Sequence, residues 1–559
     1  MQRFKLLNLA LACALLTNLP FVHAQTPQTG AAATTATARA LPAVSLEASN
    51  LITAARLSEH LHIVASDTME GRDTPSKGLD ETAKYIATHL ARFGLKPAGD
   101  DGTFFQRITL IRRKVDAVKT TAALDNRVFK FGDDFLVSPA IGKASGALVF
   151  AGHGWVFKSK NIDAYKGIDV RDKIIIAAAG LPAGVTRGDI RGKVGDDWED
   201  PESYARRNGA KGLILIPRTP NIERWWRAVR AGAERGSVEM ERFANAEGGR
   251  QVPSIFASAA MVDALFEGET VSGADIFKAT QAGETRAAFA LSPKKRVTFD
   301  VVASIEKQLT QNVVGLIEGQ DPTLRQEYVA IGAHYDHVGI GLPDASGDAI
   351  YNGADDDGSG TVAVLTMAEA FARGKARPAR SILFVWHAGE EKGLWGSQYF
   401  TKFPTVPIKQ IVAQLNIDMI GRSKKEGDRT PANRDLSGPN EIYVIGSKMM
   451  STELGDLSER VNHAFLNLNF NYKYDDPSDP NRFFFRSDHF NYAQQGIPII
   501  FYFDGVHEDY HRPSDTADKI DYQKMEKVTR TVFITALELA GATARPRVDK
   551  QLPPELNGR

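Results

Sequence analysis

Histidine and acidic side chains follow apolar runs at several places in the second half of this 559-residue chain. Imidazole and carboxylate groups bind divalent metals, and in open α/β sheets the residues that follow buried strands meet at one edge. One such residue alone is usually a capping or surface residue. Their joint occurrence predicts a metal centre at His334, Asp356, Glu391, Asp418 and His511.

The segments around the first two positions contain further acidic residues. In EYVAIGAHYDH, His334 ends a predicted strand and Asp336 follows two residues later, so Asp336 can share a face with the imidazole and orient it. In NGADDDGSG, Asp355, Asp356 and Asp357 lie between glycines at the start of a predicted helix. Because a helix cap needs only one carboxylate, the run of three indicates an additional role.

The later positions are also hard to explain without a cation. Glu390 and Glu391 are adjacent in SILFVWHAGEE, where like charges repel unless a proton or a cation lies between them. Asp418 lies in the apolar run IVAQLNID, where an unpaired carboxylate is costly to bury. In FDGVHEDYHRPSD, both His507 and His511 are available, and their spacing does not decide between them.

The pattern of apolar runs predicts the elements that bring these residues together. From Val297 onward, buried-type strands alternate with helices, which is typical of an α/β fold with a mixed, mostly parallel sheet flanked by helices. An amphipathic helix that stops at Gly94 joins this unit from earlier in the chain. Between them, short apolar runs separated by glycine and charged turns indicate an inserted, β-rich domain. The predicted strands of the α/β unit are VTFDVVASI, NVVGLIEG, EYVAIGAH, SILFVWHA, IVAQLNID, EIYVIG and PIIFYFD.

The first residues have the pattern of an export signal. MQRFK is basic, LLNLALACALL is apolar but shorter than the roughly 20 residues that span a bilayer, and Ala24 suits cleavage. The one cysteine, Cys13, lies inside this signal, so the mature chain would offer no thiolate to a metal. We predict a signal peptide over residues 1–24, a flexible linker over 25–47, and an exported protein that is periplasmic or secreted.

The remaining boundaries and the charge complete the outline. We predict a discontinuous α/β domain over residues 48–113 and 295–545, an insert over 114–294 and a tail over 546–559. Lysine and arginine total 68 and aspartate and glutamate total 68, so the net charge is zero. This balance gives no indication of nucleic acid as a partner, or of a membrane partner after signal removal. The sequence leaves the oligomeric state open.

Several motifs together resemble a known family. GAHYDH, NGADDDGSG, AGEEKGLWGS, NIDMIG, RSDHF and YHRPSDT occur in the order found in the co-catalytic di-zinc aminopeptidases. That family also contains glutamate carboxypeptidase, glutaminyl cyclase and the transferrin receptor. ASDTMEGRDTPSKGLDETAKYIATHLARFGLKPAG is similar to its amino-terminal segment. FAGHGW, AYKGIDVRDKIII and SYARRNGAKGLILI resemble a protease-associated domain, which some members carry as an insertion.

The resemblance implies two zinc ions per chain and a ligand set for each. It makes Asp356 the bridging ligand, with Glu391 and His511 completing one zinc site and His334 and Asp418 completing the other. Asp356 is selected over its neighbours by the DxxSG pattern, and His511 over the other histidine by the YHxPxD pattern.

The resemblance also implies catalytic roles. It makes Glu390 the general base, adds Asp336 to the catalytic residues, and makes Tyr510 a hydrogen-bond donor to the oxyanion. It further implies a cis peptide bond between Asp356 and Asp357. We therefore predict a metallo-aminopeptidase, in which a hydroxide bound to two zinc ions hydrolyses the first bond of peptides that have a free amino terminus.

The alternatives within the same fold are a glutaminyl cyclase and a dipeptidase or carboxypeptidase. A receptor-like scaffold without metal is disfavoured because all five ligand positions and Glu390 are filled. The residues that would bind the substrate's side chains are not visible in the sequence.

Overall fold

The computed structural model describes residues 40–137, 141–186, 189–190, 192–244, 252–284 and 286–552. The predicted signal over 1–24, with Cys13, lies outside the described residues, as does most of the predicted linker. One compact unit begins at Leu41. No helix in the described part of the chain is both long and apolar enough to cross a membrane.

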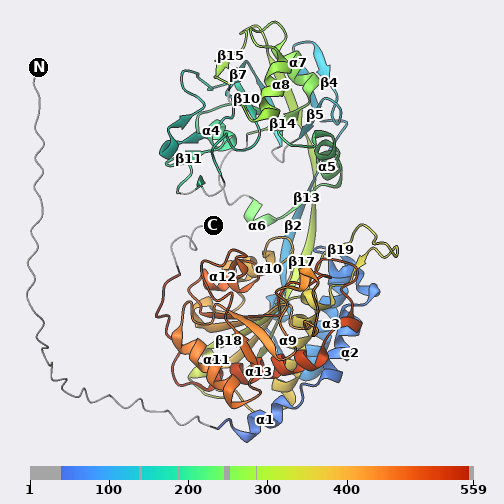
Figure 1. Ribbon diagram of the computed structural model, residues 1–559, viewed down its shortest axis with the longest axis vertical. Coiled ribbons are helices and arrows are strands. Elements are labelled where there is room, and N and C mark those ends of the chain that lie inside the picture. The colour runs from blue at the N-terminus through green and yellow to red at the C-terminus, as the bar shows by residue number, and fades with distance from the viewer. Residues whose placement is uncertain are drawn as a thin grey trace, which may run out of the picture. The chain divides into compact units, whose positions relative to one another are not determined.

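A mixed sheet organises the α/β region (Figure 1). Its strands follow the order β13-β2-β17-β21-β18-β22-β25-β23-β24, and β1 pairs with β17. Parallel pairing joins β21, β18, β22 and β25, which all run in one direction, and β23 with β24. The prediction of a mixed α/β sheet is confirmed. The strands are β1 (Lys96–Pro97), β2 (Phe105–Val115), β13 (Ser237–Met240), β17 (Ala303–Ile317), β18 (Tyr328–His334), β21 (Ser381–His387), β22 (Ile411–Ile417), β23 (Glu441–Ile445), β24 (Asn469–Asn471) and β25 (Ile499–Phe503).

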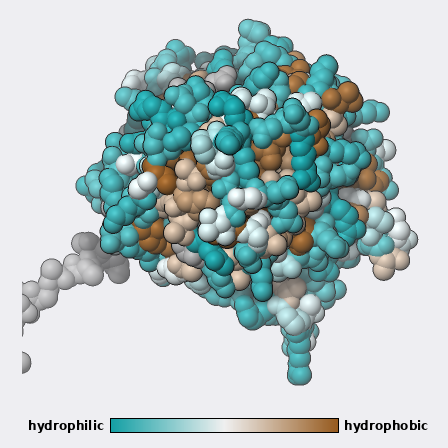
Figure 2. Space-filling view, turned by 90° about the horizontal axis from the view of Figure 1, so that it is seen from above, coloured by the Kyte–Doolittle hydropathy of each residue, from teal (hydrophilic) through white to brown (hydrophobic). Residues whose placement is uncertain are grey.

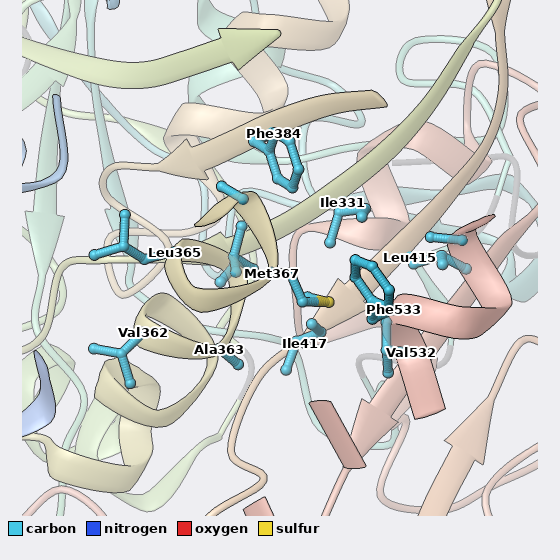
Figure 3. Close-up of a cluster of buried hydrophobic side chains, with 14 of the residues drawn as sticks. Ile331, Val362, Ala363, Leu365, Met367, Phe384, Leu415, Ile417, Val532 and Phe533 are labelled. Atoms are coloured by element: carbon cyan, nitrogen blue, oxygen red, sulfur yellow. The ribbon is translucent and has the colours of Figure 1, made fainter. Parts of the chain in front are cut away.

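Helices cover both faces of this sheet, which explains why its central strands are apolar without alternation. Ile331 and Phe384 face the cluster formed with α9 and α13, in which Figure 3 shows Phe533. Their neighbours Ala330 and Leu383 face the opposite cluster, toward α10 and α12. The helices are α1 (Ala43–Ser49), α2 (Ala54–Val64), α3 (Lys77–Phe93), α9 (Gly360–Arg373), α10 (Trp395–Lys402), α11 (Thr452–Ala464), α12 (His489–Ala493) and α13 (Tyr522–Gly541).

The amino-terminal helices agree with the sequence except at one boundary. Helix α3 begins after Ser76, whose side chain accepts the amide of Leu79, and ends at Gly94 in the left-handed conformation, as predicted. Helix α1 begins at Ala43, inside the segment predicted as a linker. This helix forms because Ala48 packs into the main core, a tertiary contact that local composition does not reveal.

The segment between β2 and β17 contains a second sheet and its own helices. Strands β7, β10, β12 and β14 are parallel, with β15 and β5 antiparallel at the edges. The strands are β5 (Phe135–Val137), β7 (Leu148–Phe150), β10 (Ile174–Ala178), β12 (Gly212–Ile216), β14 (Ser254–Ala257) and β15 (Phe289–Ala290). The helices are α4 (Pro201–Arg207), α5 (Ile222–Arg235), α6 (Glu241–Ala244), α7 (Ala259–Phe266) and α8 (Gly273–Ala282).

The described residues also form smaller sheets, two from the segment between β2 and β17 and one from the loop after β18. One has the order β4-β3-β16-β6, one β11-β8-β9, and one pairs β19 with β20. Their strands are β3 (Thr121–Leu124), β4 (Arg127–Phe129), β6 (Gly142–Gly146), β8 (Val156–Phe157), β9 (Ile162–Asp163), β11 (Trp198–Glu199), β16 (Val297–Val301), β19 (Gly339–Ile340) and β20 (Ile350–Tyr351). Hydrophilic residues cover most of the face shown in Figure 2, and hydrophobic residues appear there in separate areas.

The run VTFDVVASI, predicted as one strand of the α/β unit, is divided between two sheets. Residues up to Val301 form β16, and β17 begins at Ala303. At the break, the hydroxyl of Thr120 accepts the amide of Val302 and donates to its carbonyl. This side chain takes the place of a neighbouring strand, so the ladder is interrupted there.

Candidate metal centre

The predicted ligands come together where the parallel strands end. His334 is the last residue of β18, and Asp418 directly follows β22. Glu391 follows β21 by four residues, and His511 lies in the loop after β25. Asp356 is in a turn, Ala354–Ser359, that leads into α9. Because neighbouring parallel strands end at one edge of a sheet, residues far apart in sequence meet there.

One group of side chains surrounds the imidazole of His334. Its Nε2 lies 3.3 Å from Asp356 Oδ1, 3.6 Å from Asp418 Oδ1 and 4.0 Å from Glu390 Oε2. His334 is 1% exposed and Asp418 is 7% exposed. Three carboxylates therefore face one buried imidazole nitrogen.

A second group surrounds the other oxygen of Asp356. Nε2 of His511 lies 3.0 Å from both Asp356 Oδ2 and Glu391 Oε1. His337, which the sequence analysis did not identify, places Nδ1 3.0 Å from Glu391 Oε1 and 3.7 Å from Asp356 Oδ2. The two oxygens of Asp356 thus face different groups, as a bridging carboxylate would.

These groups fit metal ions. Asp356 Oδ2, Glu391 Oε1, His511 Nε2 and His337 Nδ1 are buried, and none has a hydrogen-bond partner within the described residues. Two sets have donor atoms close enough to hold an ion, namely His337, Asp356, Glu391 and His511, and His334, Asp357 and Asp418. We call the residues around Asp356 the metal cluster, consisting of His334, His337, Asp356, Glu390, Glu391, Asp418 and His511.

The two residues adjacent to Asp356 in sequence, Asp355 and Asp357, accept hydrogen bonds from the backbone. Asp357 lies close to His334 and Asp418, but its oxygens accept the backbone amides of His334, Gly360 and Met419 and so tie three segments together. The peptide bond between Asp356 and Asp357 is cis, as the resemblance implied.

Asp355 turns away from Asp356. Its Oδ1 accepts the amide of Gly421, and its Oδ2 lies 3.2 Å from Nε2 of His507. The structure therefore pairs His507 with Asp355 and places His511 beside Asp356.

Asp336 holds the loop that carries the two glutamates. Its carboxylate accepts the amides of Glu390 and Glu391, at 3.1 and 3.4 Å. Nδ1 of His334 lies 3.2 Å from the main-chain oxygen of Asp336 and 3.6 Å from its carboxylate. The sequence predicted that the carboxylate of Asp336 orients the imidazole of His334. In the structure the main-chain oxygen of Asp336 is nearer to the imidazole, and the carboxylate of Asp336 accepts the amides of Glu390 and Glu391.

The concentrated charge shifts the acid–base properties of these groups. Burial, together with the charges of Glu391 and Asp418, raises the pKa of Glu390 well above its usual range. Burial opposes the charge of His511, but the carboxylates of Asp356 and Glu391 raise its pKa to about 10. Without a metal ion, these carboxylates could be neutralised only by bound protons, which is why the pKa values of Glu390 and His511 are raised.

A pocket opens beside the metal cluster. The polar residues that line it include Glu390, Tyr510 and Arg486. The Arg486 guanidinium donates a long hydrogen bond of 3.5 Å to the Tyr510 hydroxyl and lies over the ring of Phe483 at 4.9 Å. Burial raises the pKa of Tyr510. The apolar residues that line it, which we call the apolar wall, are Met419, Phe483, Phe501, Phe503 and Val506.

A second buried acidic group lies next to the metal cluster. Arg422 contacts Asp509 at 2.7 Å and Asp515 at 3.5 Å, and Lys519 contacts Asp509 at 2.8 Å. Hydrogen bonds from Lys519 and Arg422 lower the pKa of Asp509 to about 2 although burial opposes this. We call this group the ion-pair cluster, consisting of Asp355, Arg422, His507, Asp509, Asp515 and Lys519.

A fully buried arginine, Arg72, connects the loop after His334 with the turn that contains Asp356. The guanidinium of Arg72 donates hydrogen bonds to the main-chain oxygens of Val64, Tyr335, Asn352 and Gly353. The carbonyls of Tyr335, Asn352 and Gly353 flank His334 and the turn that contains Asp356. The motif EGRDTPSKG contains Arg72, but nothing in its spacing indicated this contact.

Comparisons with known proteins agree with the family resemblance of the motifs. Residues 312–536 match the model described as Peptidase family M28. The resemblance inferred from the motifs is confirmed for this segment, which contains all residues of the metal cluster.

Two curated relatives and one solved structure illustrate the range of similarity. A probable leucine aminopeptidase of Arthroderma benhamiae is 31% identical over 260 residues, 42% of this chain and 64% of the relative. Leucine aminopeptidase 2 of Arthroderma otae is 26% identical over 297 residues, 48% of this chain and 53% of the relative. The chain thus spans between half and two thirds of their lengths. An aminopeptidase from Aneurinibacillus sp. strain AM-1 aligns with a TM-score of 0.49 and 18% identity, over 91% of this chain and 98% of its own.

Proposed function

We propose that this chain is an exported metallo-aminopeptidase that removes the first residue from peptides with a free amino terminus. The observation that carries the proposal is the arrangement of Asp356, whose two oxygens face separate groups of imidazole and carboxylate donors, with Glu390 beside them. This arrangement lies within the segment that matches a peptidase family. Export is inferred from the signal-like residues 1–24 alone.

The ligands of two zinc ions would come from both sides of Asp356. His334 and Asp418 would hold one ion, Glu391 and His511 the other, and Asp356 both. Zinc ions bound there supply Lewis acidity, which polarises a peptide carbonyl and lowers the pKa of water. Imidazole and carboxylate ligands, with no thiolate, suit zinc sites of hydrolytic enzymes.

Glu390 would move the proton during hydrolysis. Its Oε2 lies at the edge of the pocket, 4.0 Å from His334 Nε2. As a carboxylate it would take a proton from the attacking water at this oxygen, and it would then return the proton to the leaving amine. The amides of Glu390 and Glu391 are fixed by Asp336, which keeps the base and the adjacent ligand in place.

Tyr510 and the apolar wall would bind the substrate. The phenol of Tyr510 stays protonated because burial raises its pKa, so it can donate a hydrogen bond to the negative oxygen that develops during attack. The first side chain of the peptide would lie against Phe483, Phe501 and Phe503. An aliphatic or aromatic first residue is therefore the expected preference.

Arg486 favours a second candidate with the same chemistry. Its guanidinium lines the pocket, and no carboxylate forms an ion pair with it among the described residues. A free cation at that position could bind the terminal carboxylate of a short peptide. The second candidate is therefore a dipeptidase or carboxypeptidase.

Release of free amino acids from a peptide panel tests both candidates. The panel contains unblocked, amino-acetylated and carboxyl-amidated peptides of two to five residues, before and after chelation and zinc restoration. Cleavage of unblocked and amidated peptides, with loss on chelation, supports the aminopeptidase. A requirement for a free carboxylate supports the second candidate. No cleavage by protein that holds zinc would contradict both.

The segment over residues 114–294 is proposed to be the protease-associated insert. Its support is the sequence resemblance, together with a sheet of its own between β2 and β17. We propose that it shapes access of peptides to the pocket. Its removal, tested on peptides of increasing length, should then change the relative rates for long and short substrates.

A further inference from the structure

His337 is a buried histidine for which the proposed mechanism has no use. It follows His334 by three residues and is 0% exposed. Its backbone amide donates to the main-chain oxygen of Arg72, which holds this part of the chain in place. Neither ring nitrogen has a hydrogen-bond partner within the described residues. A buried imidazole without a partner is costly, so its position calls for a ligand.

The ring is held in one orientation. A methyl group added at Gly353 would lie 2.5 Å from Cγ of His337, so the backbone of Gly353 approaches the ring closely. Gly353 also has a positive φ of 57°. The ring also meets that of His511 edge to face, with centroids 5.5 Å apart. This close packing fixes Nδ1 toward Glu391 and Asp356.

A simple hydrogen bond to Glu391 does not explain the contact. Nδ1 of His337 lies 3.0 Å from Glu391 Oε1, yet both atoms lack a hydrogen bond of acceptable geometry. The same holds for Nε2 of His511 and Oδ2 of Asp356. Four donor atoms that are close but misaligned for hydrogen bonding point to a common centre between them.

The spacing of these atoms matches a tetrahedral ion. The contacts among them are 3.0, 3.0, 3.0 and 3.7 Å. Ligands at 2.0–2.2 Å from a tetrahedral zinc ion are separated by about 3.3–3.6 Å. The observed distances lie around this range without any rearrangement of the chain.

We propose that His337 is a fourth protein ligand, through Nδ1, of the metal held by Asp356, Glu391 and His511. This inference rests on the metal-binding part of the proposed function. The site then has two imidazoles and two carboxylates, and all its tetrahedral positions are filled by protein. The site of His334, Asp418 and the shared Asp356 has three protein ligands and keeps an open position.

The two metal sites are therefore expected to differ in function and in their affinity for zinc. A site closed by four protein ligands resembles structural zinc sites, whereas a site with three ligands and an open position resembles catalytic ones. We expect the His337 site to fill first and to lose its metal last. Substrate exchange would take place at the open site around His334.

X-ray absorption of zinc in an Asp418→Asn background tests the ligand directly. This substitution weakens the open site, so one equivalent of zinc reports on the closed site alone. Two imidazoles per zinc are expected, and one imidazole after the further change His337→Gln. A count of one imidazole before the further change would overturn the proposal, and this reading does not depend on folding of the His337 variant.

Zinc competition with a chromogenic chelator provides a second measurement. In the otherwise natural chain, His337→Gln should weaken the tighter of two zinc sites by more than the roughly 10–100-fold that loss of an indirect contact causes. The matched control is His62→Gln, an exposed histidine on α2, which should leave both affinities unchanged. Unchanged affinities in His337→Gln would contradict the proposal.

The two hypotheses fail in different ways. Protein with two zinc ions and peptide cleavage, but unaltered by His337→Gln, would refute the role of His337 alone. Zinc bound by two imidazoles without any cleavage would refute the aminopeptidase and retain the ligand. Protein that binds no zinc would refute both.

Discussion

The metal cluster and the ion-pair cluster are both buried and acidic, and they adjoin through consecutive residues, Asp355 and Asp356. They differ in their partners. Within the described residues, the ion pairs of the metal cluster are formed only with imidazoles, whereas Asp509 and Asp515 contact Arg422 and Lys519. Buried carboxylates thus do not by themselves indicate a metal. The informative feature is the absence of a permanent cation among their partners.

The strongest test of this comparison replaces one acid in each cluster. Glu390→Gln should lower the rate of peptide hydrolysis by about 10²–10⁴-fold, because the amide cannot accept the proton, while zinc content is kept. Asp509→Asn should lower the free energy of unfolding and leave the rate per folded molecule nearly unchanged. Steady-state kinetics and zinc analysis of both variants provide the measurement. Full activity of Glu390→Gln would refute its role.

The ion-pair cluster should depend on its own cation. Arg422→Met removes the arginine beside Asp515 and leaves Asp509 with Lys519 alone, and loss of one member of a buried ion pair costs about 3–5 kcal/mol. Urea unfolding in the presence of chelator measures this change. If added zinc restored the lost stability, the two clusters would not be independent.

The metal cluster should respond to zinc instead. An ion that binds only the folded state adds about 2.7 kcal/mol at a concentration 100 times its dissociation constant. The same gain is expected in Arg422→Met and in the unchanged chain, since the ions contact other residues. Thermal unfolding with and without zinc is the readout, and a gain confined to the unchanged chain would contradict the separation.

His60, which lies outside both clusters, makes the stability of the fold depend on pH independently of them. Burial lowers the pKa of His60 to about 3, against about 6.5 in the unfolded chain. As the pH falls below 6.5, the unfolded state binds a proton that the folded state does not, so stability is lost, by about 2 kcal/mol at pH 5. His60→Gln should remove this part of the decline in urea unfolding between pH 7.5 and 5. An unaltered decline would show that His60 is not buried as a neutral group.

The sequence predicted the site residues that lie at the ends of strands. His334 and Asp418 were identified because apolar runs end at them, and in the structure these runs are β18 and β22. The α/β class followed from the same runs. The proposed roles of the ligands remain predictions.

Other features depend on loop geometry and could not be predicted from spacing. His511 has a positive φ of 54°, and this local conformation turns its side chain toward Asp356 while His507 faces Asp355. Only the family resemblance distinguished them. His337 was overlooked because β18 ends before it, so alternation no longer applied. Arg72 was overlooked because its acceptors, such as Tyr335, are distant in sequence.

The pairing of β2 with β17 has a consequence for how such a chain can be shortened or extended. The two strands are antiparallel neighbours from Phe105 opposite Val313 to Val115 opposite Ala303. The chain therefore leaves β2 and enters β17 at adjacent positions of the large sheet, as in a hairpin, and in between it adds the short edge strand β13 beside β2. A two-residue turn such as Asn-Gly could replace everything between Asp116 and Val302, which removes β13 from the edge of the sheet and leaves the order of the other strands unchanged. Insertion of a whole domain at this position thus lengthens the connection between two neighbouring strands and adds one edge strand to the sheet.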